Sequence, residues 1–179
     1  MIQLYTGEGK GKTTAAIGQA IRCAGNGKKV LFTQFMKGNH TGELEILKDI
    51  PKVEILRSDK NFGFYSSMSE EQKQELTQIH NEMLRKILSE MKAGTVQMVV
   101  MDEITYPAKW GLMDDKLFST VLKEGKERSS KSTDKYPELI LTGRNPSKEM
   151  TDMSDYITRM EAIRHPYERG IQARIGIEF

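Results

Sequence analysis

Cysteine is nearly absent from this sequence of 179 residues, because Cys23 is the only one. A single cysteine excludes an intramolecular disulfide, which is typical of proteins that live in a reducing compartment. We therefore expect a cytoplasmic protein. Cys23 belongs to an apolar stripe with helical spacing, and we interpret it as a small buried hydrophobic residue.

Long hydrophobic runs are also absent. No apolar stretch approaches the ~18 residues that a membrane-spanning helix needs. A strand-like segment begins at Ile2, which leaves no room for a signal peptide. We expect no membrane partner.

A large excess of charge of either sign is lacking as well. The formal net charge is +2, although 29% of the residues are charged. Binding to nucleic acid would call for a clustered basic face. Lysines gather between residues 123 and 135, but Glu124, Glu127 and Asp134 interleave with them, which favours a solvated segment. Residues 129–135 lack periodicity and are expected to form a mobile surface loop, so we expect no nucleic-acid partner.

What the sequence does contain is an alternation of apolar strands and helices. Its length fits one domain, since single domains commonly have roughly 100–200 residues. Strands are expected at residues 2–5, 30–35, 53–56, 98–101 and 139–141, with candidate closing strands at 156–160 and 175–179. Strands that alternate with helices predict a mainly parallel sheet covered on both faces. We predict a single α/β domain over residues 1–179.

Helix signals stand between these strands. Apolar residues recur at helical spacing over 15–24. The segment Ser69-Glu70-Glu71-Gln72 matches a capping box and predicts a long helix that ends at Gly94. Residues 117–122 indicate another helix, and Pro146 is expected in the first turn of a short one.

A glycine-rich segment, Thr-Gly-Glu-Gly-Lys-Gly-Lys-Thr-Thr at residues 6–14, joins the first strand to the first helix. Gly11, Lys12 and Thr13 match the second half of the P-loop pattern G-x-x-x-x-G-K-[ST], whereas Thr6 stands at the first glycine position. Backbone N–H groups of such a loop, together with the helix N-terminus behind it, bind phosphate oxygens. The sequence therefore predicts a P-loop NTPase fold of the RecA-like type.

The expected roles within this loop follow from residue chemistry. Lys12 would reach the terminal phosphates of a nucleotide, and the Thr13 hydroxyl would join the shell of a Mg²⁺ or Mn²⁺ ion. Lys10 would add a second cation. The residues expected to bind ATP are Gly7, Glu8, Gly9, Lys10, Gly11, Lys12, Thr13 and Thr14.

Two carboxylates follow the apolar strand at 98–101. Asp102 and Glu103 stand where a Walker B strand carries its acidic residues. Ligands of open α/β sheets bind at the carboxyl ends of the strands. We expect Asp102 and Glu103, with Thr13, to hold the metal ion directly or through water.

Several blocks of the chain resemble one enzyme family. These blocks are residues 6–16, 34–38, 101–106, 141–144 and 165–179. In this order they are similar to the ATP:corrinoid adenosyltransferases of the cobalamin pathway, and they span nearly the whole chain. The block Met-Asp-Glu-Ile-Thr-Tyr at 101–106 and the C-terminal block are more specific than the loop.

The resemblance implies an unusual use of ATP. A corrinoid reduced to Co(I) would attack the ribose 5′ carbon of ATP, displace triphosphate and form a cobalt–carbon bond. The corrinoid supplies the nucleophile, so the protein aligns the reactants and stabilises the leaving group. The residues expected to contribute to catalysis are Lys12, Thr13, Glu103 and Arg144. The resemblance also implies a homodimer and a reductant of the flavoprotein type.

Two segments of the sequence supply candidate residues for the corrinoid site. Lys37 and Glu43 would touch the ribose or the corrinoid, although a solvated loop explains them equally well. By resemblance, Phe62 and Phe64 would face the corrin ring and help to remove its lower axial ligand, although a core anchor for a long loop is an equal alternative.

Two departures from relatives bear on that site. The tryptophan that some relatives carry in this segment is missing, and the only tryptophan, Trp110, lies elsewhere in the sequence. Some relatives also have an extension before the first strand. We therefore expect a corrinoid site that is more open or that is closed by other loops.

The three histidines, His40, His80 and His165, lack the spacing of metal ligands, and His80 is expected to face outward or to flank the apolar stripe of its helix. Three alternative functions remain. A P-loop ATPase or kinase would cleave the terminal phosphate, with Glu103 orienting a water. A RecA-like ATPase would bind nucleic acid, and a corrinoid-binding regulator would lack activity.

Overall fold

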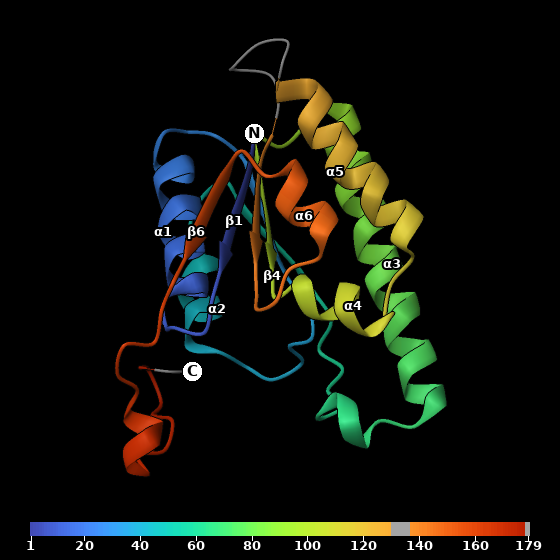
Figure 1. The fold of residues 1–179 in the computed structure, drawn as a ribbon. Coiled ribbons are helices and arrows are strands. Elements are labelled where there is room, and N and C mark those ends of the chain that lie inside the picture. Colours follow the sequence, from blue (N-terminus) through green and yellow to red (C-terminus); the bar gives the residue numbers. More distant parts are fainter. Residues whose placement is uncertain (130–136, 178–179) are drawn as a thin grey trace.

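The computed structural model of the protein describes residues 1–129 and 137–177 (Figure 1). Its centre is a six-stranded sheet in the order β3-β2-β4-β5-β1-β6. Every neighbouring pair of strands is parallel, which confirms the predicted α/β class. The strands are β1 Ile2–Thr6, β2 Val30–Gln34, β3 Val53–Arg57, β4 Met98–Asp102, β5 Glu138–Thr142 and β6 Tyr156–Arg159.

Helices cover both faces of this sheet. In Figure 1, α1 and α2 lie on one side, and α3, α5 and α6 lie on the other. The helices are α1 Lys12–Gly25, α2 Gly42–Leu47, α3 Glu70–Ala93, α4 Thr105–Trp110, α5 Asp115–Ser129 and α6 Lys148–Met153, with short 3₁₀ turns η1 Tyr65–Ser67 and η2 Pro166–Arg169. None of these described helices combines the length and the apolar composition that crossing a membrane requires.

Two hydrophobic cores follow from the two-residue periodicity of the strands. In β4, Val99 and Met101 pack with α3 and α5, whereas Val100 packs with the alanines of α1. Successive side chains of a strand point to opposite faces, so a strand buried on both sides has to be apolar throughout. This is the reason that the central strands read as continuous apolar runs.

The predicted capping box begins α3. The Ser69 hydroxyl accepts a hydrogen bond from the Gln72 N–H, and the Gln72 side chain accepts one from the Ser69 N–H. Gly94 ends the helix in a left-handed conformation with φ of 68°. Both ends of the longest helix are thus fixed by local sequence.

Two expectations are wrong in detail. Residues 175–177 form a turn instead of a strand, and 178–179 lie outside the described residues. Pro146 precedes the short helix α6, whose N-cap is Ser147. Of the two positions expected for His80, the one beside the apolar stripe is confirmed, because His80 is 1% exposed and lies with Leu76 and Met83 on the buried face of α3. The predicted mobile loop lies outside the described residues, apart from Ser129, which ends α5.

Two short helices have no clear signal in the sequence. Helices α2 and α4 contain six residues each. Helices this short are stabilised by packing rather than by their own propensity, so periodicity reveals little about them. Of the two, α4 matters for function, because it brings Trp110 to the site described next.

Candidate functional site

The glycine-rich loop lies between the end of β1 and the start of α1, at the carboxyl edge of the sheet. Lys12 opens α1 and folds back over the loop, where its ammonium group donates to the carbonyl oxygens of Gly7 at 2.8 Å and Gly9 at 2.7 Å. Burial lowers the pKa of Lys12, and the Arg144 guanidinium lowers it further. The ammonium group is therefore held inside the loop, where a phosphate would meet it.

The loop glycines are required by the chain that passes beside them. A Cβ atom on Gly7 would lie 2.3 Å from the Met160 carbonyl oxygen, and one on Gly9 would lie 2.7 Å from the Glu161 carbonyl carbon. The Gly9 N–H also donates to the Met160 carbonyl oxygen at 2.8 Å. Met160 follows β6, so this edge of the sheet fixes the loop from outside. This packing of the chain after β6 against the loop glycines has no signal in the sequence.

Asp102, the last residue of β4, is the centre of a hydrogen-bond cluster. Its Oδ1 atom accepts from the hydroxyls of Thr13 at 2.8 Å and Thr142 at 2.6 Å. Its Oδ2 atom accepts from the Lys37 ammonium at 2.8 Å. The cluster joins the loop after β1 with the ends of β4 and β5, because parallel strands bring their carboxyl ends to one edge.

Lys37 lies three residues beyond the end of β2. The Asp102 side chain is fully buried, whereas the Lys37 side chain is 26% exposed. Burial alone would lower the pKa of Lys37, but the Asp102 carboxylate outweighs it, and the net effect raises that pKa. The expected contact of Lys37 with ribose or corrinoid is thus not its contact here, which is an ion pair with Asp102.

Glu103 has an unusual backbone and an unpaired oxygen. Its φ is 61°, a left-handed value that is uncommon for a residue other than glycine. Its N–H donates to the Thr142 hydroxyl at 2.9 Å, while its Oε2 atom is buried with no hydrogen-bond partner among the described residues. Burial raises the pKa of Glu103, and the Asp102 carboxylate adds to that rise. Strained, underpaired acids of this kind cluster at functional sites.

Arg144 follows β5 and contacts the glycine-rich loop. Its guanidinium lies 3.1 Å from a Glu8 carboxylate oxygen. Lys10, the other cation of the loop, donates to the carbonyl oxygen of Ile177 in the C-terminal segment. Arg144 and Lys10 are thus two further cations beside the loop, in addition to Lys12. The phosphates of a nucleotide would compete with Glu8 and the Ile177 carbonyl for them.

These residues enclose a cavity of about 420 Å³, which we call the phosphate pocket. It is lined by Glu8, Gly9, Lys10, Gly11, Lys12, Thr13, Thr14, Glu103, Tyr106, Arg144, His165 and Ile177. Seven of the eight expected loop residues therefore share one cavity, all except Gly7, whose carbonyl holds Lys12. His165 and Ile177 come from the C-terminal block, which the resemblance picks out but whose contact with the loop the sequence does not predict.

A second cavity of about 630 Å³, which we call the aromatic pocket, adjoins the first. Glu103 and Tyr106 line both cavities. The other lining residues are Met36, Lys37, Gly38, Asn39, His40, Thr41, Asn61, Gly63, Phe64, Tyr65 and Trp110. The two cavities therefore meet at Tyr106, in the first turn of α4, and at Glu103, two residues before that helix.

Trp110 lies far from segment 61–66 in the sequence but lines the same cavity. The Tyr65 and Trp110 rings stack with centroids 4.7 Å apart and an interplanar angle of 7°. Tyr106, one turn earlier in α4, packs against Trp110 at 4.9 Å. The tryptophan that is missing from segment 61–66 is thus supplied to the same cavity by α4.

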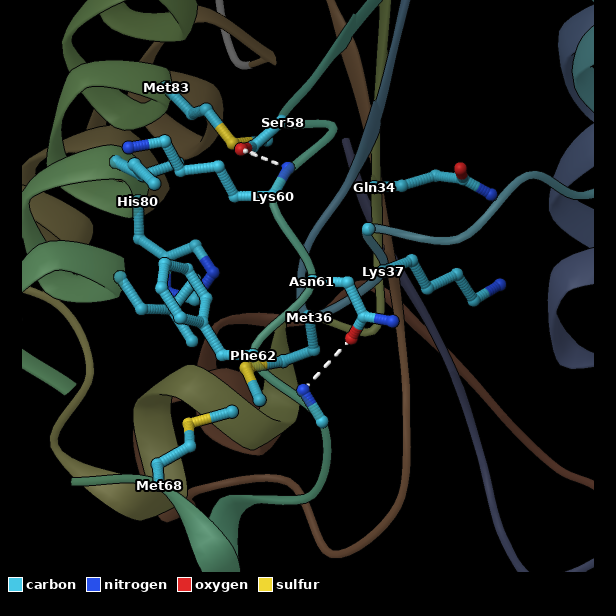
Figure 2. A pocket seen from close by; sticks show the side chains of 14 residues that line it. Gln34, Met36, Lys37, Ser58, Lys60, Asn61, Phe62, Met68, His80 and Met83 are labelled. Carbon is cyan, nitrogen blue, oxygen red and sulfur yellow. Dashed lines mark hydrogen bonds between the residues drawn. The ribbon is translucent and has the colours of Figure 1, made fainter. Parts of the chain in front are cut away.

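The two phenylalanines of segment 61–66 have different environments. Phe64 is 85% exposed and borders the aromatic pocket. Phe62 is half-buried and packs against the cluster of Met68, Leu76 and Leu112. Figure 2 shows Phe62 pointing into the small cavity near His80, Met36 and Met68, whereas Lys37 points away from it. The core-anchor alternative therefore holds for Phe62, and a ligand contact remains open to Phe64.

Glu43 lies apart from both pockets. Its Oε1 atom accepts a hydrogen bond from the Gln34 side chain at 3.1 Å, and Glu43 lines neither cavity.

His40 pairs with Glu45 at 2.7 Å on the surface. The described residues contain no group of three or more His, Cys, Asp or Glu side chains that would hold a metal.

Oxygen donors at the carboxyl end of β4 nevertheless fit a magnesium ion whose remaining ligands are phosphate oxygens of a nucleotide. Mg²⁺ prefers hydroxyl, carboxylate and phosphate oxygens and uses only one or two protein ligands beside a nucleotide. The Thr13 hydroxyl, the Asp102 carboxylate and the unpaired Glu103 Oε2 atom supply this chemistry.

Comparison with known proteins agrees with the geometry. The family model for ATP:corrinoid adenosyltransferases (BtuR/CobO/CobP) matches residues 1–179. The corrinoid adenosyltransferase of Escherichia coli K12 is 28% identical over 179 residues, which cover 100% of this chain and 85% of that protein. A corrinoid adenosyltransferase of Sinorhizobium is 29% identical over 189 residues and is covered to 80%. A KaiC-like protein of Pyrococcus horikoshii superposes with a TM-score of 0.52 at 18% identity over 89% of this chain and 70% of that one, which shows the shared fold alone.

Proposed function

The chain belongs to the ATP:corrinoid adenosyltransferase family, and we propose that it transfers the 5′-deoxyadenosyl group of ATP to the cobalt of a reduced corrinoid. Co(I) supplies both electrons of the new cobalt–carbon bond. The bond between C5′ and its oxygen breaks, and its electron pair leaves with triphosphate. The reaction serves the synthesis or salvage of adenosylated corrinoids.

The observation that carries this proposal is the junction of the two pockets. Glu103 and Tyr106 line both pockets, and we propose that a nucleotide whose phosphates lie in the loop directs its ribose toward them. An apolar ring system seated in the aromatic pocket would meet the ribose across that shared wall. A kinase or ATPase, by contrast, has no need of a large aromatic cavity beside the phosphate site, so the geometry favours adenosyl transfer over the alternative.

The proposed work of the protein is positional and electrostatic. Lys12, Lys10 and Arg144 stabilise the charge that develops on the leaving triphosphate. Thr13, Asp102 and Glu103 hold a Mg²⁺ or Mn²⁺ ion, which neutralises further phosphate charge when bound. Phe64, Tyr65 and Trp110 present aromatic faces to the corrin ring. No covalent intermediate on the protein is required, because the corrinoid brings the nucleophile.

We also propose that the protein acts as a homodimer. Strand β6 is an edge strand whose four residues are all exposed. Exposed large hydrophobic side chains continue from it along the C-terminal segment, namely Tyr156, Ile157, Ile163, Tyr167, Ile171, Ile175 and Ile177. An apolar strand edge left in water favours association, so a second copy is the expected cover. Light scattering of the purified protein would show twice the mass of one chain, and a monomer at micromolar concentration would contradict it.

Two further proposals concern its surroundings. Co(I) has to be supplied by a strong one-electron donor, and we propose a flavoprotein reductant. The single cysteine supports residence in the reducing cytoplasm.

Anaerobic turnover tests the proposed function. The purified protein is mixed with ATP, Mg²⁺ and chemically reduced cobalamin, and the corrinoid spectrum is followed. We expect a light-sensitive adenosylated corrinoid whose formation requires ATP. An unchanged corrinoid spectrum with steady release of inorganic phosphate would return the protein to the ATPase class.

A further inference from the structure

The ion pair between Lys37 and Asp102 has no role in the proposed reaction as described so far. Asp102 is fully buried, and each of its oxygens is already engaged: Oδ1 by two threonine hydroxyls and Oδ2 by Lys37. Among the residues that the structure describes, Lys37 is the cation within hydrogen-bond distance of this carboxylate. A buried carboxylate without such a partner is costly, which explains why the ammonium group is held there.

A metal ion in the proposed site would satisfy the same need. Asp102 and Thr13 belong, with Glu103, to the proposed metal shell, and the Thr13 hydroxyl donates directly to Asp102. Two full positive charges that share one small carboxylate repel each other strongly in a buried setting. The metal and the Lys37 ammonium are thus rivals for the Asp102 carboxylate.

A destination for the displaced ammonium group lies beside it. Lys37 lines the aromatic pocket, and so does Glu103. Glu103 carries the buried Oε2 atom that lacks a hydrogen-bond partner among the described residues, and it is close enough to contribute to the raised pKa of Lys37. The Lys37 side chain is long and partly exposed, so it can turn without unpacking the core.

From this arrangement we propose that Lys37 is a metal-dependent positioning residue, which holds Asp102 until Mg²⁺–ATP binds and then turns away from it into the aromatic pocket. The inference rests on the proposed function, since it takes the metal and nucleotide to bind at this edge. It also implies an order of binding. Mg²⁺–ATP binds first in the phosphate pocket, and the movement of Lys37 then changes the charge that faces the aromatic pocket.

The first test compares nucleotide affinity with and without metal. Calorimetric titration with ATP plus Mg²⁺, and with ATP plus EDTA, gives a ratio of affinities for each variant. Lys37→Met removes the rival cation, so this ratio is expected to rise by about tenfold, which corresponds to ~1.4 kcal/mol. Lys60→Met is the matched control, because Lys60 pairs with Glu75 on the surface and its loss leaves the ratio unchanged. An equal or smaller ratio in Lys37→Met would overturn the proposal.

The second test needs no variant, because Lys37→Met leaves a buried carboxylate unpaired and so endangers folding. A crystal structure of the wild-type protein with ATP and Mg²⁺ reports the position of Lys37 directly. We expect its ammonium group to have left Asp102, now 2.8 Å away, and to lie in the aromatic pocket. An intact contact with Asp102 beside bound Mg²⁺–ATP would overturn the inference and leave the proposed function standing. Failure of the wild-type protein to bind Mg²⁺–ATP at all would overturn both.

Discussion

At the scale of single residues, the phosphate pocket depends on the charge of Lys12 and on the absence of side chains from the loop glycines. Lys12 supplies a buried ammonium group, and the glycines supply the space through which the chain after β6 passes. These two requirements are separable, since one concerns charge and the other concerns steric fit. They give two different predictions.

The first prediction concerns Lys12. Lys12→Ala removes the ammonium group that is held by Gly7 and Gly9 at the mouth of α1. Charge-assisted hydrogen bonds contribute roughly 1.5–3 kcal/mol, so the affinity for Mg²⁺–ATP is expected to fall by about 10- to 100-fold. Calorimetric titration measures this fall, with Lys28→Ala as a control on exposed lysine loss. Near wild-type affinity in Lys12→Ala would remove it from the proposed site.

The second prediction concerns the glycines. Gly9→Ala would place a methyl group 2.7 Å from backbone atoms of Glu161, which cannot move without disturbing β6. We expect Gly9→Ala to lower both the melting temperature and the affinity for Mg²⁺–ATP.

A matched control lies two turns into α1. A Cβ atom on Gly18 would meet nothing within 4 Å, and alanine is a better helix former than glycine. Gly18→Ala is expected to raise the free energy of unfolding by about 0.5–1 kcal/mol and to leave nucleotide binding unchanged. If Gly9→Ala behaved like Gly18→Ala, the close approach of the Glu161 backbone would not constrain the loop.

At the scale of elements, segment 61–66 and α4 form the aromatic pocket together. The Tyr65 ring lies flat against Trp110, so a 3₁₀ turn and a short helix that are distant in sequence become one surface. Phe62 points toward the core and Phe64 points toward solvent, which divides the segment into an anchor and an exposed face.

The third prediction separates these two phenylalanines. Phe64→Ala is expected to reduce the rate of corrinoid adenosylation while ATP affinity and the melting temperature stay close to wild type, because Phe64 is 85% exposed. Phe62→Ala is expected to lower the free energy of unfolding by about 2 kcal/mol, because it opens a cavity in a half-buried cluster. Turnover, calorimetry and thermal unfolding of both variants decide the matter. Equal loss of ATP affinity and turnover in Phe64→Ala would assign it a structural role.

How far sequence alone reaches is also clearest at this scale. The loop, the acidic pair at the end of β4 and the ends of α3 are local signals, so spacing alone located them. The surroundings of Trp110 and His80 could not be predicted, because the fold brings their neighbours to them, from segment 61–66 in one case and from Phe35 and Leu112 in the other. The turn at 175–177 was mistaken for a strand, because isoleucines that alternate with polar residues satisfy the strand pattern wherever they lie.

At the scale of the whole molecule, stability is tied to pH through one buried histidine. His80 is 1% exposed, its Nδ1 atom lies 2.8 Å from the Leu112 carbonyl oxygen, and burial lowers its pKa from 6.5 to about 4. Above pH 6.5 the ring is neutral in both the folded and the unfolded chain, so it has no effect on stability. As the pH falls from 6.5 toward 4, His80 becomes protonated in the unfolded chain but stays neutral in the folded chain. The free energy of unfolding therefore decreases.

The fourth prediction is the size of that loss. One proton gives a slope of ~1.4 kcal/mol per pH unit, so the free energy of unfolding should fall by about 2 kcal/mol between pH 6.5 and 5 on account of His80. His80→Asn preserves a donor toward Leu112 but has no titrating ring, and its stability should fall less over this range. His40→Asn is the control, since His40 is exposed. Urea unfolding at both pH values measures the difference, and parallel slopes in wild type and His80→Asn would contradict the account.

The two pockets share Glu103 and Tyr106, and on this junction rests the claim that the protein joins an adenosyl group to cobalt. The most direct test is the stoichiometry of the phosphate product, measured by chromatography of single turnovers with ATP, Mg²⁺ and limiting Co(I) corrinoid under anaerobic conditions. The account predicts one triphosphate for each cobalt–carbon bond, with no ADP above the level seen without corrinoid. Release of ADP in step with corrinoid consumption would contradict it, because the bond broken would then lie between phosphates and not at the ribose 5′ carbon.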